Sequence, residues 1–394
     1  MQQKLFKNKL HLEYLDSLRG IASLTVVCSH YVLAYGLPTN SSNLIYWLTF
    51  SPLHIWWDGF AAVSLFFVLS GFVLSLKYYS DPQTVIHINA REFINYVIAR
   101  VCRIWLPYFF CFGISVVLLF LTVPLETTPA SSPWARGFWQ GLPAPSAILA
   151  EMALILPGAG YRIVPQAWTL KLELLLSLFV PFAILLASRS VWLLLAGSAI
   201  AVLLIKMPLY WMHFLAGIML AKYYLAWQER AVSKKILAAL LGAGLFFYTF
   251  RFTLPIYAPG VIAEHRIFYM TGLGSALLLL FLMKMPAWQR FLEQRSLLLL
   301  GKCSYGIYLL HFAVILCLTP RALALANWAG ITDFRFAWWW GLVVTLAVTI
   351  LGGLIFFRVV EAPSILLGKF LVRRRGLNKI LAANKPKNLS SSPR

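Results

Sequence analysis

Apolar residues run through this chain in long, nearly unbroken stretches. Ten such stretches stand out, at 15–37, 59–79, 104–124, 168–187, 190–205, 209–226, 236–250, 267–284, 297–318 and 338–358. About 20 apolar residues in a helix cross the hydrocarbon layer of a bilayer, and a helix satisfies its own backbone polar groups there. The pattern therefore predicts an all-α, polytopic membrane helical bundle of about ten transmembrane helices, with no attached soluble domain.

The polar segments divide the chain into two unequal parts. Residues 1–368 contain all ten stretches, and we expect them to form one transmembrane domain. Residues 369–394 contain eight basic residues and no acidic one, which predicts a disordered cytoplasmic arm near anionic lipid. In the longest loop, 125–167, the apolar run AILAEMALIL at 147–156 is too short to span a bilayer. Whether that run is re-entrant or interfacial stays open.

Composition and charge support a membrane protein. Only 12% of the residues are charged and the mean hydropathy is +0.77, whereas about a quarter of an ordinary soluble domain is charged. The net charge of +21 would suggest nucleic-acid binding in a soluble protein, but its placement argues otherwise. With the N-terminus inside, 24 of the 34 Lys and Arg residues fall in cytoplasmic segments and 7 in external ones. This asymmetry predicts cytoplasmic N- and C-termini, membrane lipid as a partner and no nucleic acid.

The sequence offers no metal-binding pattern. All five cysteines lie in or beside apolar stretches, and none forms a Cys-x-x-Cys pair. We therefore expect neither a metal site nor a disulfide framework.

The first apolar stretch carries three ionisable residues in LDSLRGIASLTVVCSH at 15–30. Arg19 and His30 are eleven residues apart, so in a helix they share one face and lie about 16 Å apart along the axis. Asp16 lies three residues before Arg19, close enough to pair with it. The plainer alternative is two interfacial residues and a core histidine. Because ionisable groups inside a membrane are costly and usually mark function, we favour a functional site.

Two later stretches carry further candidates. Counting the helical rise places His30 about 22 Å and His311 about 21 Å from the cytoplasmic ends of their helices. Glu173 enters from the opposite side, and we expect it at a similar height. The sequence thus predicts a layer of two imidazoles and one carboxylate near the outer face. Tyr305, on the same stretch as His311, is a candidate for a supporting role.

The cytoplasmic ends are basic. Arg100 and Arg103 precede the third stretch, and Glu361 follows the tenth. Arginines here could simply anchor the helix at the membrane surface. Ser70 belongs to a small Ser-Gly pair that is typical of close helix packing, and it is a further supporting candidate.

Six blocks of this sequence resemble acyltransferase family 3, the integral-membrane O-acyltransferases that modify bacterial surface glycans. The matching blocks are LDSLRG with Arg19-x10-His30, WWDGFAAVSLFFVLSGFVLSL at 56–76, Arg100-Val-Cys-Arg103 followed by IWLPY, Trp168-Thr-Leu-Lys-Leu-Glu173, SYGIYLLH at 304–311 and Glu361-Ala-Pro363. The resemblance covers nearly the whole chain. The chain departs from the pattern at Lys171, where similar proteins vary, and it lacks the soluble esterase-like domain of some members.

The resemblance implies transfer of an acyl group, with acetyl expected, from cytoplasmic acyl-CoA to a hydroxyl of an extracytoplasmic glycan or lipid-linked saccharide. It implies a multi-pass protein of the bacterial inner membrane, with acetyl-CoA as a co-substrate and no bound cofactor. Arg19, Arg100 and Arg103 would bind the donor. His30 would act as general base, and Glu173 would orient it or bind the acceptor. Asp16 would accompany the catalytic group as the partner of Arg19, with Tyr305, His311, Glu361 and Ser70 in support.

Other readings stay open at this point. A proton-coupled transporter or flippase would also bury charges among many helices, although no inverted repeat is visible in the sequence. An acyl-histidine intermediate is compatible with the same residues. For transfer across the membrane, we expect a continuous cavity from the arginines past Arg19 to His30.

Overall fold

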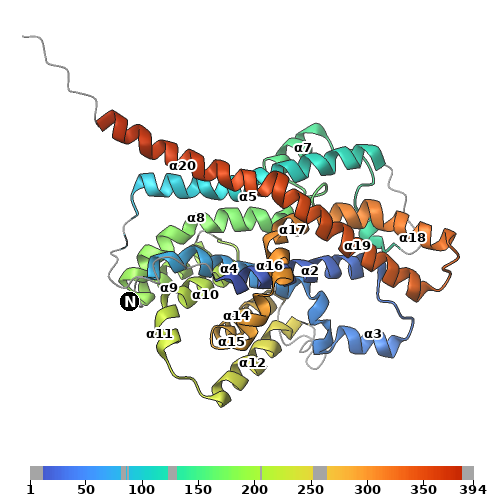
Figure 1. The fold of residues 1–394 in the computed structure, drawn as a ribbon, viewed down its shortest axis with the longest axis horizontal. Helices are drawn as coiled ribbons and strands as arrows, with labels where there is room; N and C mark the ends of the chain where they lie inside the picture. Colours follow the sequence, from blue (N-terminus) through green and yellow to red (C-terminus); the bar gives the residue numbers. More distant parts are fainter. Residues whose placement is uncertain are drawn as a thin grey trace, which may run out of the picture.

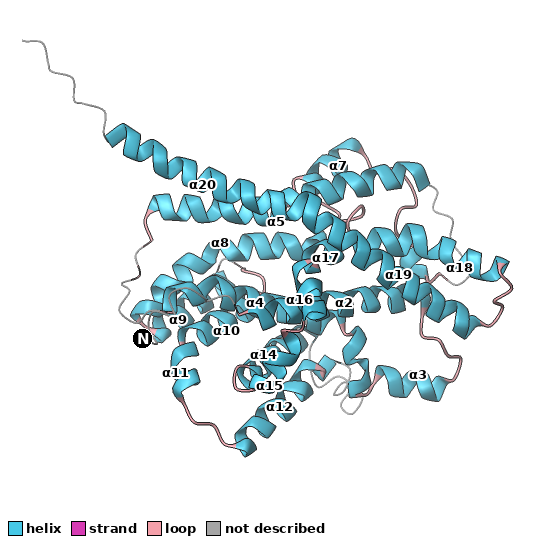
Figure 2. Cartoon of the chain, in the orientation of Figure 1, coloured by secondary structure: helices cyan, strands magenta, loops and turns pink. Residues whose placement is uncertain are grey.

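The structure is a computed structural model that describes residues 12–80, 86, 88–122, 131–204, 206–251 and 264–383. Within these ranges every regular element is a helix and there is no strand (Figure 2), which confirms the all-α expectation for this part of the chain. The residues before Leu12, positions 125–130 of the long loop and positions 384–394 of the tail lie outside the described ranges.

In the part of the chain that the structure describes, six helices are long and apolar enough to cross a membrane. They are α2 (Glu13–Tyr35), α4 (Gly59–Tyr79), α5 (Ala90–Thr122), α8 (Ala167–Arg189), the continuous helix Ser304–Trp328 and the continuous helix Phe334–Arg375. A seventh span results if Tyr269–Leu282 and Pro286–Leu292, which meet at 102°, are taken as one. In Figure 1, α2, α5, α8 and the α19–α20 helix run roughly along the long axis of the molecule.

The other elements are shorter. They are α3 (Ser42–Thr49), η1 (Pro52–Trp57), α6 (Pro133–Arg136), α7 (Pro145–Met152), α9 (Val191–Leu204), α10 (Trp211–Lys222), α11 (Tyr224–Glu229), α12 (Lys234–Tyr248), α14 (Glu264–Leu282), α15 (Pro286–Leu292), α16 (Arg295–Lys302), α17 (Ser304–Ala313), η2 (Val314–Leu318), α18 (Thr319–Trp328), α19 (Phe334–Phe356), η3 (Phe357–Glu361) and α20 (Ala362–Ala383). Every expected span contains helix. However, α9, α10 and α12 have only 12 to 15 residues, fewer than the roughly 20 that a bilayer needs. The count of ten spans therefore stays a prediction.

Helix α5 begins at Ala90, well before the expected start at 104. Its first half is not a continuous apolar run, but it packs along α20 (Figure 1). The Arg91 side chain donates to the carbonyl of Arg375 at 3.1 Å, and Gly368 lies against Cys102. Tertiary packing thus extends the helix, and Arg100 lies about three turns inside it.

Helix α20 crosses residue 368, where the sequence suggested that a disordered tail begins. The helix continues to Ala383, so residues 369–383 are helical. Contact with α5 continues as far as Arg375, and such packing stabilises a helix more than local propensity does.

Helix α4 lies at the centre of the bundle, between α2, α8, α10 and α14. It crosses α10 at two glycines that leave no room for a side chain. A Cβ on Gly71 would lie 2.2 Å from the carbonyl oxygen of Phe214, and one on Gly217 would lie 2.1 Å from that of Val68. The close packing expected at 70–72 is thus confirmed at Gly71.

A second pair of glycines brings the N-terminal half of α2 against α16. A Cβ on Gly20 would lie 2.8 Å from the backbone of Gly301, and one on Gly301 would lie 2.4 Å from the backbone of Asp16. The chain breaks after Lys302, and α17 then runs beside α2. This arrangement places the residues of α2 and α17 in register along the bundle.

Candidate functional site

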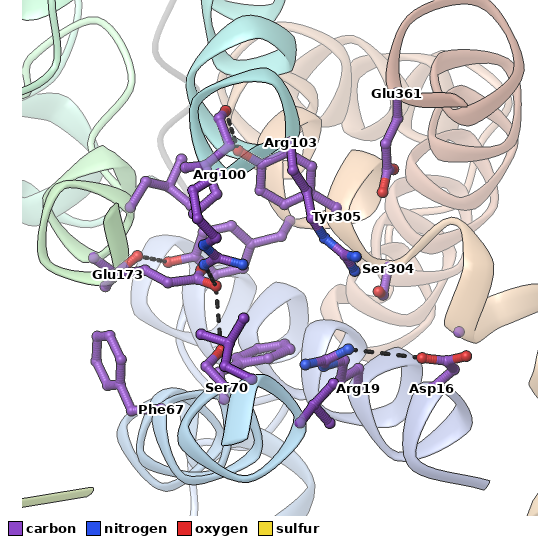
Figure 3. A pocket seen from close by; sticks show the side chains of 18 of the residues that line it. Asp16, Arg19, Phe67, Ser70, Arg100, Arg103, Glu173, Ser304, Tyr305 and Glu361 are labelled. Atoms are coloured by element: carbon purple, nitrogen blue, oxygen red, sulfur yellow. Dashed lines mark hydrogen bonds and ion pairs between the residues drawn. The ribbon is translucent and has the colours of Figure 1, made fainter. Parts of the chain in front are cut away.

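A cavity of about 250 Å³ lies where α2, α4, α5, α8, α16, α17 and η3 converge (Figure 3). Its charged lining consists of Asp16, Arg19, Arg100, Arg103, Glu173, Lys302 and Glu361. Ser70, Thr169, Ser304, Tyr305 and Tyr308 add hydroxyl groups. Eight of the ten site residues expected from the sequence therefore meet in one cavity, and the two histidines do not line it.

Arg100, on α5, contacts two residues of α8 at one wall of this cavity. Its Nη2 lies 3.2 Å from Oε1 of Glu173, and its Nε donates to Oγ of Ser177 at 3.2 Å. The hydroxyl of Ser70 donates to the same Glu173 oxygen at 3.2 Å. Glu173 and Ser177 lie one turn apart on α8, so Arg100 spans that turn. The network joins α4, α5 and α8.

The expected layer of His30, His311 and Glu173 is wrong for Glu173. We expected Glu173 level with the two imidazoles, but it is paired with Arg100 at the arginine-lined cavity. The cause is the early start of α5. Because Arg100 lies about three turns inside the helix instead of at its end, it reaches deep enough to meet Glu173.

The opposite wall carries a second set of charges. Nη1 of Arg19 lies 3.7 Å from Oδ1 of Asp16, as their spacing predicted, and both are partly buried. Arg103 points into the cavity from α5, and Glu361 points in from η3 (Figure 3). Glu361 ends a π-helical turn, a distortion that often occurs at functional sites. The hydroxyl of Tyr305 donates to the carbonyl of Ile104 at 2.7 Å, which fixes this ring against α5.

The two histidines contact each other farther along α2, which carries His30, and α17, which carries His311. Nδ1 of His30 lies 2.8 Å from Nε2 of His311, which confirms that α2 and α17 bring them to the same height. Trp134 of α6 covers His30 with a centroid distance of 5.7 Å, and Phe312 meets it edge-on at 5.5 Å. The long loop thus lies against the imidazole pair.

Tyr308 separates the cavity from the histidines. Its side chain lines the cavity, while its ring centroid lies 5.7 Å from that of His311. Its hydroxyl is 2.5 Å from Oγ1 of Thr169, and Phe66 packs edge-on against it. Among the described residues, the lining of this cavity includes neither histidine, so the continuous cavity expected from the arginines to His30 is not seen there. The cavity ends at Tyr308, one helical turn short of His311.

Glu151 is a structural residue that the sequence analysis did not single out. Its carboxylate accepts three backbone N–H bonds, from Arg162, Ile163 and Val164, at 2.8 to 3.0 Å. Burial raises the pKa of Glu151 above its ordinary value, while these three bonds act in the opposite direction. The lone acid in the apolar run 147–156 was the available signal. That run forms the short helix α7 and a turn.

Gln166 connects the folded loop to α17. Its side-chain amide donates to the carbonyl of Leu309 at 2.6 Å, two residues before His311. The loop therefore lies directly over the helix that carries the second imidazole.

No metal centre emerges from the described ranges. Among these residues, no group of three or more His, Cys, Asp or Glu side chains is arranged to hold a metal ion. All five cysteines are free thiols.

Comparison with known proteins identifies a family and a relative. A family model described as an acyltransferase domain matches residues 12–358. The chain is similar to Acyltransferase R4 of Phoma sp. (strain ATCC 20986 / MF5453), with 24% identity over 89% of this chain and 93% of that protein. No solved structure matches the chain.

Proposed function

The chain belongs to the acyltransferase family whose domain covers residues 12–358, and from this premise we propose that it transfers an acyl group from acyl-CoA to a hydroxyl. The resemblance to acyltransferase family 3 read from six sequence blocks is thereby confirmed. Membership and the six long apolar helices fit a multi-pass membrane protein. The observation that carries the donor assignment is the meeting of Arg19, Arg100 and Arg103 at one cavity.

These arginines suit the phosphates of CoA. A guanidinium group binds phosphate bidentately, and a thin pantetheine arm separates the phosphates of CoA from its thioester. Arg103 is exposed and points into the cavity, so it is placed to meet the donor first. Arg19 lies on the helix that leads towards His30. Arg100 is held by Glu173, and an arriving phosphate would compete with that carboxylate.

His30 is the proposed general base. As the acceptor oxygen attacks the thioester carbonyl, neutral imidazole takes the hydroxyl proton. The new C–O bond forms, the C–S bond breaks, and the CoA thiolate leaves and takes that proton from His30. Since the cavity ends at Tyr308, the arm must pass this side chain to reach His30. Rotation of the Tyr308 ring away from Thr169 would open that route.

The sides of the membrane follow from the charge distribution. The asymmetry of 24 inside against 7 outside supports a cytoplasmic position for the arginine-lined end and both termini in the cytoplasm. The donor then enters from the cytoplasm, with acetyl-CoA as the expected form. The acceptor, an extracytoplasmic glycan or lipid-linked saccharide, would approach His30 beside Trp134. The expected membrane is the bacterial inner membrane.

Acyl turnover by purified protein tests this function. Protein in lipid nanodiscs is supplied with acetyl-CoA labelled in the acetyl group, and release of CoA is followed with and without cell-envelope saccharides. We expect acceptor-dependent release in the wild type and a fall of about 100-fold or more in His30→Asn. Asn retains an N–H donor near the position of Nδ1 but cannot act as a base. Turnover at the wild-type rate in folded His30→Asn would refute the assignment of the base.

A further inference from the structure

His311 makes hydrogen bonds that fix where its own protons lie. Its Nδ1 is 2.7 Å from the carbonyl oxygen of Tyr308, and its Nε2 is 2.8 Å from Nδ1 of His30. A carbonyl oxygen can only accept a hydrogen bond. Nδ1 of His311 must therefore carry a proton and donate it to Tyr308.

The charge of His311 then determines the tautomer of His30. Trp134 stacks on His30, Phe312 packs edge-on against both rings, and no carboxylate in the described ranges forms a hydrogen bond or ion pair with either imidazole. A doubly protonated imidazolium would be costly in such a pocket. Neutral His311, protonated at Nδ1, has a lone pair at Nε2. That lone pair accepts a proton from Nδ1 of His30.

The ring geometry agrees with a directional bond. The two ring planes differ by 3° and their centroids lie 5.0 Å apart, while the two nitrogens are 2.8 Å apart. The centroid separation exceeds the nitrogen separation by roughly one ring diameter. The rings thus meet edge to edge in nearly one plane, so the N–H of His30 points at the in-plane lone pair of His311.

We propose that His311 is a positioning residue that holds His30 as the Nδ1–H tautomer and leaves the lone pair of His30 at Nε2. This inference rests on the proposed function and extends it by naming the nitrogen that takes the hydroxyl proton. When Nε2 of His30 is protonated, the resulting imidazolium still donates from Nδ1 to His311. The neutral imidazole of His311 thus stabilises the transient charge, as a carboxylate does in a hydrolase triad.

Two substitutions at His311 test the positioning role kinetically. His311→Gln keeps an oxygen that can accept from Nδ1 of His30, whereas His311→Phe keeps ring volume without an acceptor. We expect kcat to fall about 10- to 100-fold in His311→Phe and to recover most of the loss in His311→Gln. The KM for acetyl-CoA should stay unchanged in both, because the donor cavity does not include His311.

Nitrogen-15 NMR of histidine-labelled protein measures the tautomer of His30 directly. The measurement can be made on the wild type as well as on the variants. The His30 signals are assigned by their loss in His30→Asn. We expect a protonated Nδ1 and a bare Nε2 in the wild type, and a mixture of tautomers in His311→Phe. Because the wild-type spectrum decides the tautomer, a poorly folded His311→Phe protein would not remove the test.

The outcomes separate the two proposals. Wild-type turnover in His30→Asn would refute the proposed base, whatever His311 does. Loss of turnover in His30→Asn with an unchanged kcat in folded His311→Phe would refute only the positioning role. A proton on Nε2 of wild-type His30 would also overturn it.

Discussion

Glu173→Gln distinguishes two roles for the carboxylate that pairs with Arg100: competition with the donor phosphate, or an acceptor-side role. The substitution keeps size and hydrogen-bonding capacity but removes the charge. In the structure Glu173 lies 3.2 Å from Nη2 of Arg100. A phosphate on the other side of that guanidinium would lie roughly 6 Å from the carboxylate, where like-charge repulsion at an effective dielectric constant of about 20 is ~3 kcal/mol. Because Glu173 is 26% exposed, solvent screening reduces this to about 1–2 kcal/mol.

The expected result is tighter donor binding. Removal of about 1–2 kcal/mol of repulsion lowers the Kd for CoA by roughly 5- to 30-fold. Isothermal titration of CoA into the protein in nanodiscs measures this change. Glu293→Gln, an exposed carboxylate that does not line the cavity, is the matched control and should leave the Kd unchanged. An unchanged Kd in Glu173→Gln, combined with a kcat at least 100-fold lower, would refute this reasoning and favour an acceptor-side role for Glu173.

The remaining predictions concern donor binding and stability. Arg103→Lys should raise the KM for acetyl-CoA by about 10-fold, since Lys lacks the bidentate fork, whereas Arg91→Lys on the same helix should leave it unchanged. Gly217→Leu should lower the free energy of unfolding by about 3 kcal/mol or more, because α4 leaves no room for a Cβ. Gly113→Leu, with open space around it, should lower the unfolding temperature far less in the same thermal-unfolding experiment. Since burial raises the pKa of Glu151 from 4.5, folding binds its proton more tightly. Stability should therefore fall as pH rises through the raised pKa, a dependence that unfolding of Glu151→Ala should lack.

Each of these three predictions is contradicted by a specific result. An unchanged donor KM in Arg103→Lys would leave Arg103 as a surface anchor. Equal unfolding temperatures for Gly217→Leu and Gly113→Leu would contradict the tight crossing of α4 and α10. The same pH dependence in wild type and Glu151→Ala would show that Glu151 titrates as it does in the unfolded chain.

The contact between His30 and His311 could be predicted because the height of each residue follows from its position along a regular helix. Each helix begins near the basic end of the bundle and rises about 1.5 Å per residue. Residue counting therefore gave nearly equal heights, and the structure places the two nitrogens 2.8 Å apart. The pairing of Asp16 with Arg19 followed in the same way from helical spacing.

The partner of Glu173 could not be predicted because it depends on where α5 begins. An apolar run marks a membrane span, but residues 90–103 are helical through contact with α20, a segment more than 250 positions later in the chain. The break between α16 and α17 at Cys303 likewise interrupts a stretch that looked continuous. Both features arise from tertiary packing, which single-sequence periodicity does not contain.

The end wall at Tyr308 is a third feature of this kind. SYGIYLLH indicated a functional helix, but the contact of Tyr308 with Thr169 requires α8 and α17 to lie together. Its position between the arginines and the histidines became visible only in three dimensions.

A cryo-electron microscopy structure with a non-hydrolysable acetyl-CoA analogue, in which a methylene group replaces the thioester sulfur, tests the central claim most directly. The account predicts CoA phosphates against Arg19, Arg100 and Arg103, the pantetheine arm along the cavity, a displaced Tyr308 ring and the acetyl carbonyl beside Nε2 of His30. An analogue bound outside the cavity, or bound within it with the acetyl group at the arginines and the phosphates at the histidines, would contradict the account.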